Sequence, residues 1–165
     1  MNIFFLDRNP TKAAGYHCDQ HIVKMAVEYA QLLSTALHET GSTLNDWVYK
    51  PTHQHHPCSI WVAQSLSHWA WLWKLGHHVG NEYTTRYHKI HKSTRVLRCL
   101  PVPNKLPELG WLSDPPQAMP DEYKAEDTVT AYRNFYLYDK VRFARWNRST
   151  PPTWWHKTLV KEEKV

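Results

Sequence analysis

Apolar and polar residues alternate with a helical period between residues 18 and 38, and this segment is the clearest element of the sequence. Plotted at 3.6 residues per turn, one side is apolar and carries Ile22, Met25, Ala26, Tyr29, Leu32, Leu33 and Ala36. The other side is polar and carries His21, Lys24, Glu28, Gln31 and Thr35. The apolar stripe is broad enough to face the core of a globular protein, so the polar stripe must face bulk water or a cleft.

The rest of the chain predicts further helices separated by irregular segments. Asn9 and Pro10 are typical of a helix start after residues 2–6, which form a short strand or an extended segment. A second long apolar segment with helical spacing begins at Pro57 and runs to residue 89, and we expect it to pack on the first long helix. A third, shorter helix is expected at about 125–138.

Composition agrees with a single folded unit. A chain of 165 residues that is 42% hydrophobic and 13% aromatic excludes a disordered protein and fits one domain. Residues 99–120 hold six prolines without periodicity, which predicts a long irregular segment at the surface. We therefore predict an all-α, compact single domain over residues 1–165, with two long packed helices, a third shorter helix and long Pro-rich irregular segments.

Neither a membrane segment nor a disulfide framework is indicated. No run of 18 apolar residues occurs, and the apolar patch before Asp7 is too short for a signal peptide. The three cysteines have no CxxC spacing, which suits reduced thiols in a reducing compartment. We expect a soluble, cytoplasmic protein.

Cations and aromatic rings gather in two segments of this basic chain, whose formal net charge is +5. The first segment has no acidic residue and contains Arg86, Lys89, Lys92, Arg95 and Arg98. The second interleaves cations with rings and contains Arg142, Arg145, Trp146, Trp154 and Trp155. Cations that follow a phosphate backbone, together with rings that stack on bases, predict a nucleic-acid surface. The alternative for each segment is a solvated helix face with aromatic residues in the core.

Cysteines and histidines of two segments have the side chains that zinc prefers. Cys18 and His21 are three residues apart in the first long helix, and His56 and Cys58 close a histidine-rich loop. The spacings of known zinc fingers are absent, and a buried cysteine beside a hydrogen-bonded histidine explains the same residues. We favour a protein without metal or cofactor over one with a zinc site.

Lys24 and Glu28 place an amine and a carboxylate one helical turn apart. A deprotonated amine attacks an electrophilic carbon while a carboxylate moves protons, and these two groups suffice for Schiff-base chemistry. The simpler alternative is a surface ion pair worth about 0.3 to 0.5 kcal/mol, which the spacing alone favours.

Three stretches of the chain resemble one enzyme family. CDQHIVKMAVEYAQLL, HHPCSIWVAQSLSHWAWL and TPPTWWHK look like the pyrimidine-dimer DNA glycosylase family of the bacteriophage endonuclease V type, and more closely like its phage relatives. The shared pattern is Asp-Gln-His, a Glu nine residues after the Asp, a His before the second helix, and a terminal Pro-Thr-Trp-aromatic sequence.

The resemblance implies an enzyme that grips bent duplex DNA, extrudes a base, cleaves its glycosidic bond and nicks the abasic product by β-elimination. Glu28 matches the catalytic carboxylate of the family, and His21 and His56 match histidines near its site. The family attacks with the α-amine that is exposed when Met1 is removed, which in this chain belongs to Asn2. The resemblance also implies a viral protein in the host cytoplasm.

The sequence therefore predicts a DNA-binding N-glycosylase, with AP-lyase activity, that acts on damaged or modified pyrimidines. Glu28 is the expected acid or base, and the nucleophile is the terminal amine, Lys24 or a water molecule. We prefer the α-amine, because its reference pKa is about 7.7 to 8.0 against about 10.4 for lysine. Two alternatives remain: a non-catalytic viral accessory protein that binds nucleic acid, and an enzyme acting on free nucleotides.

Overall fold

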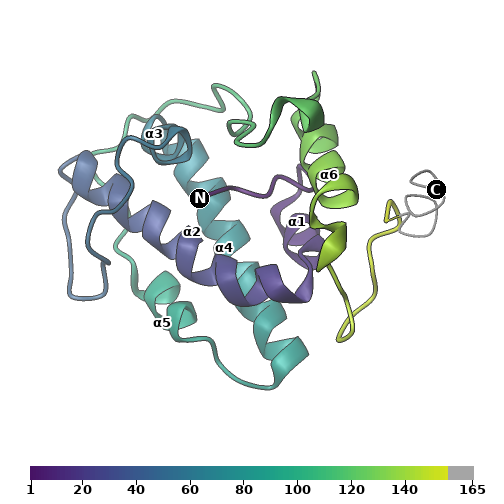
Figure 1. Cartoon of the computed structure of the whole chain (residues 1–165). Coiled ribbons are helices and arrows are strands. Elements are labelled where there is room, and N and C mark those ends of the chain that lie inside the picture. The colour runs from purple at the N-terminus through teal and green to yellow at the C-terminus, as the bar shows by residue number, and fades with distance from the viewer. Residues whose placement is uncertain (156–165) are drawn as a thin grey trace, which may run out of the picture.

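The computed structural model describes residues 1–155, and all regular elements in this range are helical (Figure 1). The six α-helices are α1 (Pro10–Tyr16), α2 (Asp19–Glu39), α3 (Pro57–Ala63), α4 (Leu66–Tyr87), α5 (Lys92–Cys99) and α6 (Thr128–Tyr138). Two 3₁₀ turns follow the Pro-rich segment and α6, and these are η1 (Asp121–Tyr123) and η2 (Lys140–Arg142). The prediction of a compact all-α fold with an irregular Pro-rich segment is confirmed. None of the helices in the described range is long and apolar enough to cross a membrane.

The predicted helix starts coincide with side-chain caps. Asn9 Oδ1 accepts from the backbone N–H groups of Thr11 at 2.9 Å and Lys12 at 3.3 Å, and Pro10 occupies the first helical position. The long first helix was expected over residues 18–38 and is observed as α2 over Asp19–Glu39. Its apolar stripe packs against α4 and α3 in the core.

The prediction of one helix from Pro57 to residue 89 is wrong, because the helix is interrupted at Ser65, between α3 and α4. The Ser65 backbone is extended, and its side chain accepts from the N–H of Ser67 at 3.1 Å to cap α4. The same hydroxyl donates to the carbonyl of Gly110 at 2.8 Å, so the break also anchors the Pro-rich segment. A serine that satisfies the backbone groups of a turn competes with helix continuation.

Helix α5 was not predicted, and it packs closely on α4 through two glycines. A Cβ atom on Gly80 would lie 2.7 Å from Thr94 Oγ1, and one on Gly76 would lie 3.1 Å from a methyl group of Leu97. The N–H of Trp73 Nε1 donates to the carbonyl of Leu97 at 2.8 Å and fixes the end of the helix. The two glycines therefore set the position of α5, whose outer face carries cations.

We expect Gly80→Val to lower the free energy of unfolding by about 1 to 3 kcal/mol, because the added methyl groups overlap Thr94 in a packed interface. Urea unfolding followed by circular dichroism measures the change. The double variant Gly80→Val/Thr94→Ala should recover part of the loss. Gly110→Val is the matched control, since nothing lies within 4 Å of a Cβ at that position. A Gly80→Val protein as stable as the parent would contradict the close packing.

The N-terminal residues form a buried extended segment, not a strand paired in a sheet. Figure 1 shows this purple segment crossing the middle of the molecule between α2 and α6. The N–H of Phe4 donates to the hydroxyl of Tyr29 on α2 at 3.2 Å, and the carbonyl of Leu6 accepts from Arg133 on α6 at 2.9 Å. Phe4 and Phe5 are almost fully buried. The start of the chain is therefore held between α2 and α6.

Candidate active site

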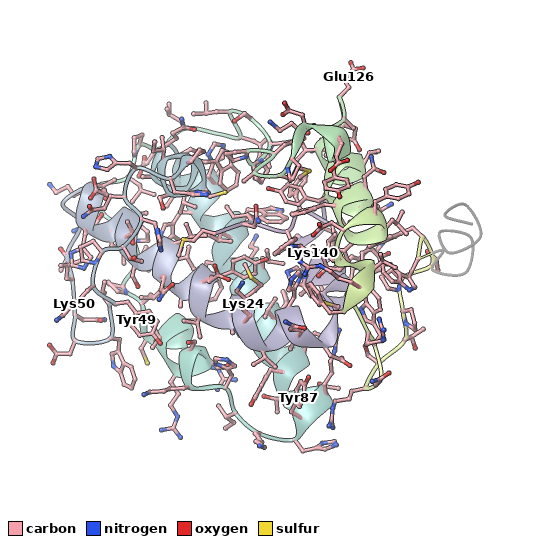
Figure 2. The ribbon with its side chains drawn as sticks, viewed as in Figure 1. Lys24, Tyr49, Lys50, Tyr87, Glu126 and Lys140 are labelled. Atoms are coloured by element: carbon pink, nitrogen blue, oxygen red, sulfur yellow. The ribbon has the colours of Figure 1, made fainter. Side chains whose placement is uncertain are left out.

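A small polar cavity lies where the N-terminal segment meets α2 and the end of α6. Its volume is about 60 Å³, and it is lined by Met1, Asn2, Phe4, His21, Lys24, Met25, Glu28 and Lys140. Figure 2 shows two of these residues near each other: Lys24 on α2 and Lys140 just beyond the end of α6. The structure thus brings together four of the five predicted catalytic residues, which are Asn2, His21, Lys24 and Glu28.

Lys24 and Glu28 both line the cavity without pairing. In residues 1–155 no ion pair within 4.0 Å and no hydrogen bond joins the two side chains to each other or to another group. Lys24 is exposed and Glu28 is half-buried. Lys24 and Glu28 therefore do not form the simple surface ion pair that their spacing allows. The amine and the carboxylate are both available to a ligand.

The polar stripe does not face the cavity along its whole length. Thr35, two turns beyond Glu28, is fully buried, and its hydroxyl donates to the carbonyl of Thr52 at 3.2 Å. The same Oγ1 accepts from the N–H of Thr52 at 3.1 Å. The prediction that the whole stripe faces water or a cleft is wrong at Thr35, which instead attaches the loop before α3.

His21 is a buried, neutral member of the cavity wall. Its Nδ1 lies 2.6 Å from the hydroxyl of Tyr136, and its ring stacks on Phe4 with 4.3 Å between centroids. Burial lowers the pKa of His21 well below its ordinary value of 6.5, and the positive charges of Lys140 and Lys24 lower it further. At neutral pH His21 therefore offers a hydrogen bond, not a positive charge.

His56 lies close to the cavity but does not line it. Its Nδ1 accepts from the N–H of Cys58 at 3.0 Å and caps α3. Burial lowers the pKa of His56, and the charge of the N-terminal amine contributes to this shift, which places the amine within electrostatic range of the imidazole. The structure thus gives His56 a capping role at the edge of the site.

A buried hydrogen-bond chain that the sequence analysis missed holds the N-terminal segment on α2. The Nδ1–H of His17 donates to the carbonyl of Ala13 at 2.6 Å, because a carbonyl only accepts. Its Nε2 then accepts from the hydroxyl of Tyr29 at 2.7 Å, and Tyr29 accepts from Phe4. Burial lowers the pKa of His17 to about 3. The sequence holds 12 histidines, and nothing in their spacing marks this one.

We expect the free energy of unfolding to fall in acid, because His17 is buried in its neutral form. Its pKa falls from 6.5 to about 3 on folding, so its contribution to stability is complete above pH 6.5 and is lost as the pH falls toward 3. At one pH unit below 6.5 the loss is about 1.4 kcal/mol. Denaturant unfolding at pH 7.5 and 5.5 measures it. His17→Gln should show a flatter pH dependence, whereas the exposed His88→Gln should not; equal slopes in all three proteins would contradict the assignment.

Lys140 completes the cavity and was not predicted. Its Nζ lies 4.3 Å from the ring centroid of Phe135 and 3.2 Å from Asp139 Oδ2, and its side chain is only 16% exposed. Stacking on an aromatic face orients the ammonium group. Lys140 follows the third predicted helix by sequence, and only the packing of α6 across the N-terminal segment brings it to α2.

The residues considered for zinc are used in other ways. Cys18 is buried 3.7 Å from the hydroxyl of Tyr136, which also pairs with His21, while Cys58 is buried in α3. Within the described range, no group of three or more His, Cys, Asp or Glu residues is arranged to hold a metal ion.

The prediction that Arg86 contacts nucleic acid is wrong, because its guanidinium is buried. It lies 3.2 Å from an oxygen of Asp19 and 3.0 Å from one of Glu82, with no exposed side-chain area. It also donates to the carbonyls of His17 at 2.7 Å and Gly15 at 3.0 Å. Arg86 therefore ties α4 to the end of α1. Lys89, Lys92, Arg95 and Arg98 are exposed.

The rings of the second basic segment face inward. Trp146 is 6% exposed and donates from Nε1 to the carbonyl of Tyr16 at 3.2 Å, so its predicted role as a stacking surface is wrong. Trp154 and Trp155 are partly buried and pack against the core. Arg142 and Arg145 are exposed. The last two residues of the TPPTWWHK motif lie outside the described residues.

Comparisons of the chain with protein-family models, with curated proteins and with solved structures give no match. The geometry of the cavity and the surrounding charge therefore carry the functional conclusion.

Proposed function

We propose that the protein is a DNA base-excision enzyme, an N-glycosylase with AP-lyase activity on damaged or modified pyrimidines. The observation that carries this proposal is the cavity that Glu28 lines together with Lys24 and Met1, the residue that bears the terminal amine, while the Glu28 carboxylate has no partner within residues 1–155. The resemblance of the α2 sequence to the pyrimidine-dimer DNA glycosylases supports it, because Glu28 stands where that family has its catalytic carboxylate.

The cavity contains the groups that an imine mechanism requires. A neutral amine attacks C1′ of the target nucleotide, the glycosidic bond breaks, and the base leaves with its bonding electrons and takes up a proton. The C1′–O4′ bond then breaks, O4′ takes up the proton that the amine loses, and an imine forms at C1′. Glu28 then removes a proton from C2′, the C3′–O bond breaks, and the 3′ phosphate leaves. Neutral His21 supplies a hydrogen-bonding group beside these atoms.

Two amines are candidates for the attack, and the N-terminal amine is preferred. An α-amine needs a smaller fall in pKa than a lysine to be neutral near pH 7. The hydrogen bond from Phe4 to Tyr29 also holds the first residues in the cavity wall. Lys24 is exposed at the cavity mouth, and its flexible side chain has to be ordered before it attacks.

The test is cleavage of defined substrates by the purified protein. Duplexes carry a cyclobutane pyrimidine dimer, an abasic site or a hydroxymethylated pyrimidine, and products are separated with and without alkali. Mononucleotides in parallel reactions test the alternative of an enzyme acting on free nucleotides. We expect base release from at least one modified duplex and strand cleavage at the abasic site. Absence of cleavage in every duplex would overturn the proposal.

A non-catalytic nucleic-acid-binding protein is the second candidate, and the exposed cations of α5 favour it independently of the cavity. Such a protein would bind the same duplexes in a salt-dependent manner. It would bind without cleaving them, and Glu28→Gln would leave its binding intact.

A further inference from the structure

An exposed tryptophan lies beside the cationic helix α5, in the loop between α2 and α3. Asn45 Nδ2 donates to the carbonyl of Cys99 at 2.8 Å, and the hydroxyl of Tyr49 lies 3.0 Å from Ser93 Oγ. These two contacts attach the loop to both ends of α5. Trp47, between them in sequence, is 45% exposed. Figure 2 shows the labelled Tyr49 next to α5 on this side of the molecule.

The outer face of α5 is a row of free cations. Lys92, Arg95 and Arg98 are exposed at i, i+3 and i+6, so they lie on one side of the helix. In residues 1–155 none of the three forms an ion pair within 4.0 Å. Asp46 contributes one opposing charge beside Trp47. The net charge of this surface remains positive.

The N-terminal end of α5 is attached to α2 next to Lys24. His91, which caps α5, places its Nε2 3.0 Å from the carbonyl of Val23 on α2. Val23 precedes Lys24, which lines the cavity. A polyanion that reaches Lys24 can therefore extend along α5 toward Trp47.

We propose that Lys92, Arg95, Arg98 and Trp47, the α5 surface, bind a single-stranded stretch of nucleic acid. The cations contact successive phosphates, and the indole of Trp47 stacks on an unpaired base. In a duplex both faces of each internal base are already covered by its neighbours, so the ring selects unpaired nucleotides. The inference rests on the proposed function, since the bound stretch is the flank of the strand whose target nucleotide reacts at the cavity.

The experiment compares the affinity of the intact protein for two uncleavable duplexes, one blunt and one with a single-stranded extension of random sequence. Fluorescence anisotropy over a range of salt concentrations measures both. We expect the extended duplex to bind about 5-fold or more tightly, which is the lower end of the range for stacking one base. Trp47→Ala should abolish this difference. Arg95→Gln/Arg98→Gln should weaken binding and reduce the salt dependence by about one to two phosphate contacts.

Two controls separate this surface from general effects. Trp111→Ala removes another exposed indole, which packs on Phe5 and Trp71 away from α5, and should keep the preference. Lys12→Gln removes an exposed charge of α1 and should keep most of the salt dependence.

The binding preference is measured independently of cleavage, so the α5 surface and the proposed function can fail separately. A protein that cleaves modified DNA but binds both duplexes equally refutes the α5 surface and leaves the proposed function standing. A protein that prefers the extension but never cleaves refutes the enzyme and leaves the surface standing. If Trp47→Ala retains the full preference, the stacking assignment is wrong.

Discussion

Glu28→Gln is expected to lower the rate of base release by about 10²- to 10⁴-fold while leaving the protein folded. Glutamine has nearly the same shape as glutamate but cannot exchange a proton at neutral pH. Within residues 1–155 the carboxylate makes no hydrogen bond or ion pair, so the substitution breaks no contact of the fold. Single-turnover cleavage of a modified duplex measures the rate.

Glu39→Gln is the matched control, because this carboxylate is exposed at the end of the same helix. It should retain the parental rate. Binding of uncleavable DNA by Glu28→Gln should be unchanged or tighter, since one negative charge is removed from the site. A fully active Glu28→Gln protein would show that Glu28 is not the acid or base of the reaction.

Arg86→Ala is expected to lower the free energy of unfolding by about 3 to 5 kcal/mol, which is the cost of breaking a buried charge pair from one side. The loss leaves Asp19 Oδ1 and the carbonyls of Gly15 and His17 without the donor that Arg86 supplies. Denaturant unfolding at pH 7.5 measures it.

Arg95→Ala is the control for the same change of residue type on an exposed helix face, and we expect an effect within about 0.5 kcal/mol. Arg86→Lys should also destabilise the protein, because one ammonium group does not reproduce the several directions in which the guanidinium donates. Equal stabilities of Arg86→Ala and Arg95→Ala would contradict the buried role of Arg86.

The parts of the fold that follow local rules could be predicted from the sequence. The period of apolar residues gave α2 almost to the residue, and Asn9 with Pro10 marked the start of α1. The break at Ser65 could not be predicted, because it depends on a hydrogen bond to Gly110 in a distant segment. Helix α5 was missed because its cations obscured a short buried side that packs against α4 and α2.

The residues of the candidate site also divide into those that local spacing predicts and those that only the packing brings together. Lys24 and Glu28 were found because both lie on one helix, where spacing determines proximity. Lys140 joins them only through the packing of α6, so no local pattern shows it. Arg86 and Arg95 have similar basic surroundings in the sequence, although Glu82 one turn before Arg86 was an available sign of an ion pair.

Tryptophans show the limit of reasoning from residue type. Trp146 and Trp47 are equally suited to stack on a base, but the first is covered by the core and the second is 45% exposed. Their exposure depends on how the segments after α6 and α2 fold back on the helices. The sequence analysis assigned base stacking to Trp146, Trp154 and Trp155 and did not identify Trp47 as an exposed ring.

Reductive trapping with borohydride tests the proposed chemistry most directly. The protein is mixed with duplex DNA containing an abasic site, reduced, digested, and analysed by mass spectrometry to find the attached residue. Attachment at Lys24 would replace the terminal amine as nucleophile, and base release without an adduct would indicate a water molecule activated by Glu28. The account predicts a covalent complex joined through the N-terminal residue at the cavity. The account is contradicted if the protein gives no adduct with abasic DNA and releases no base from any modified duplex.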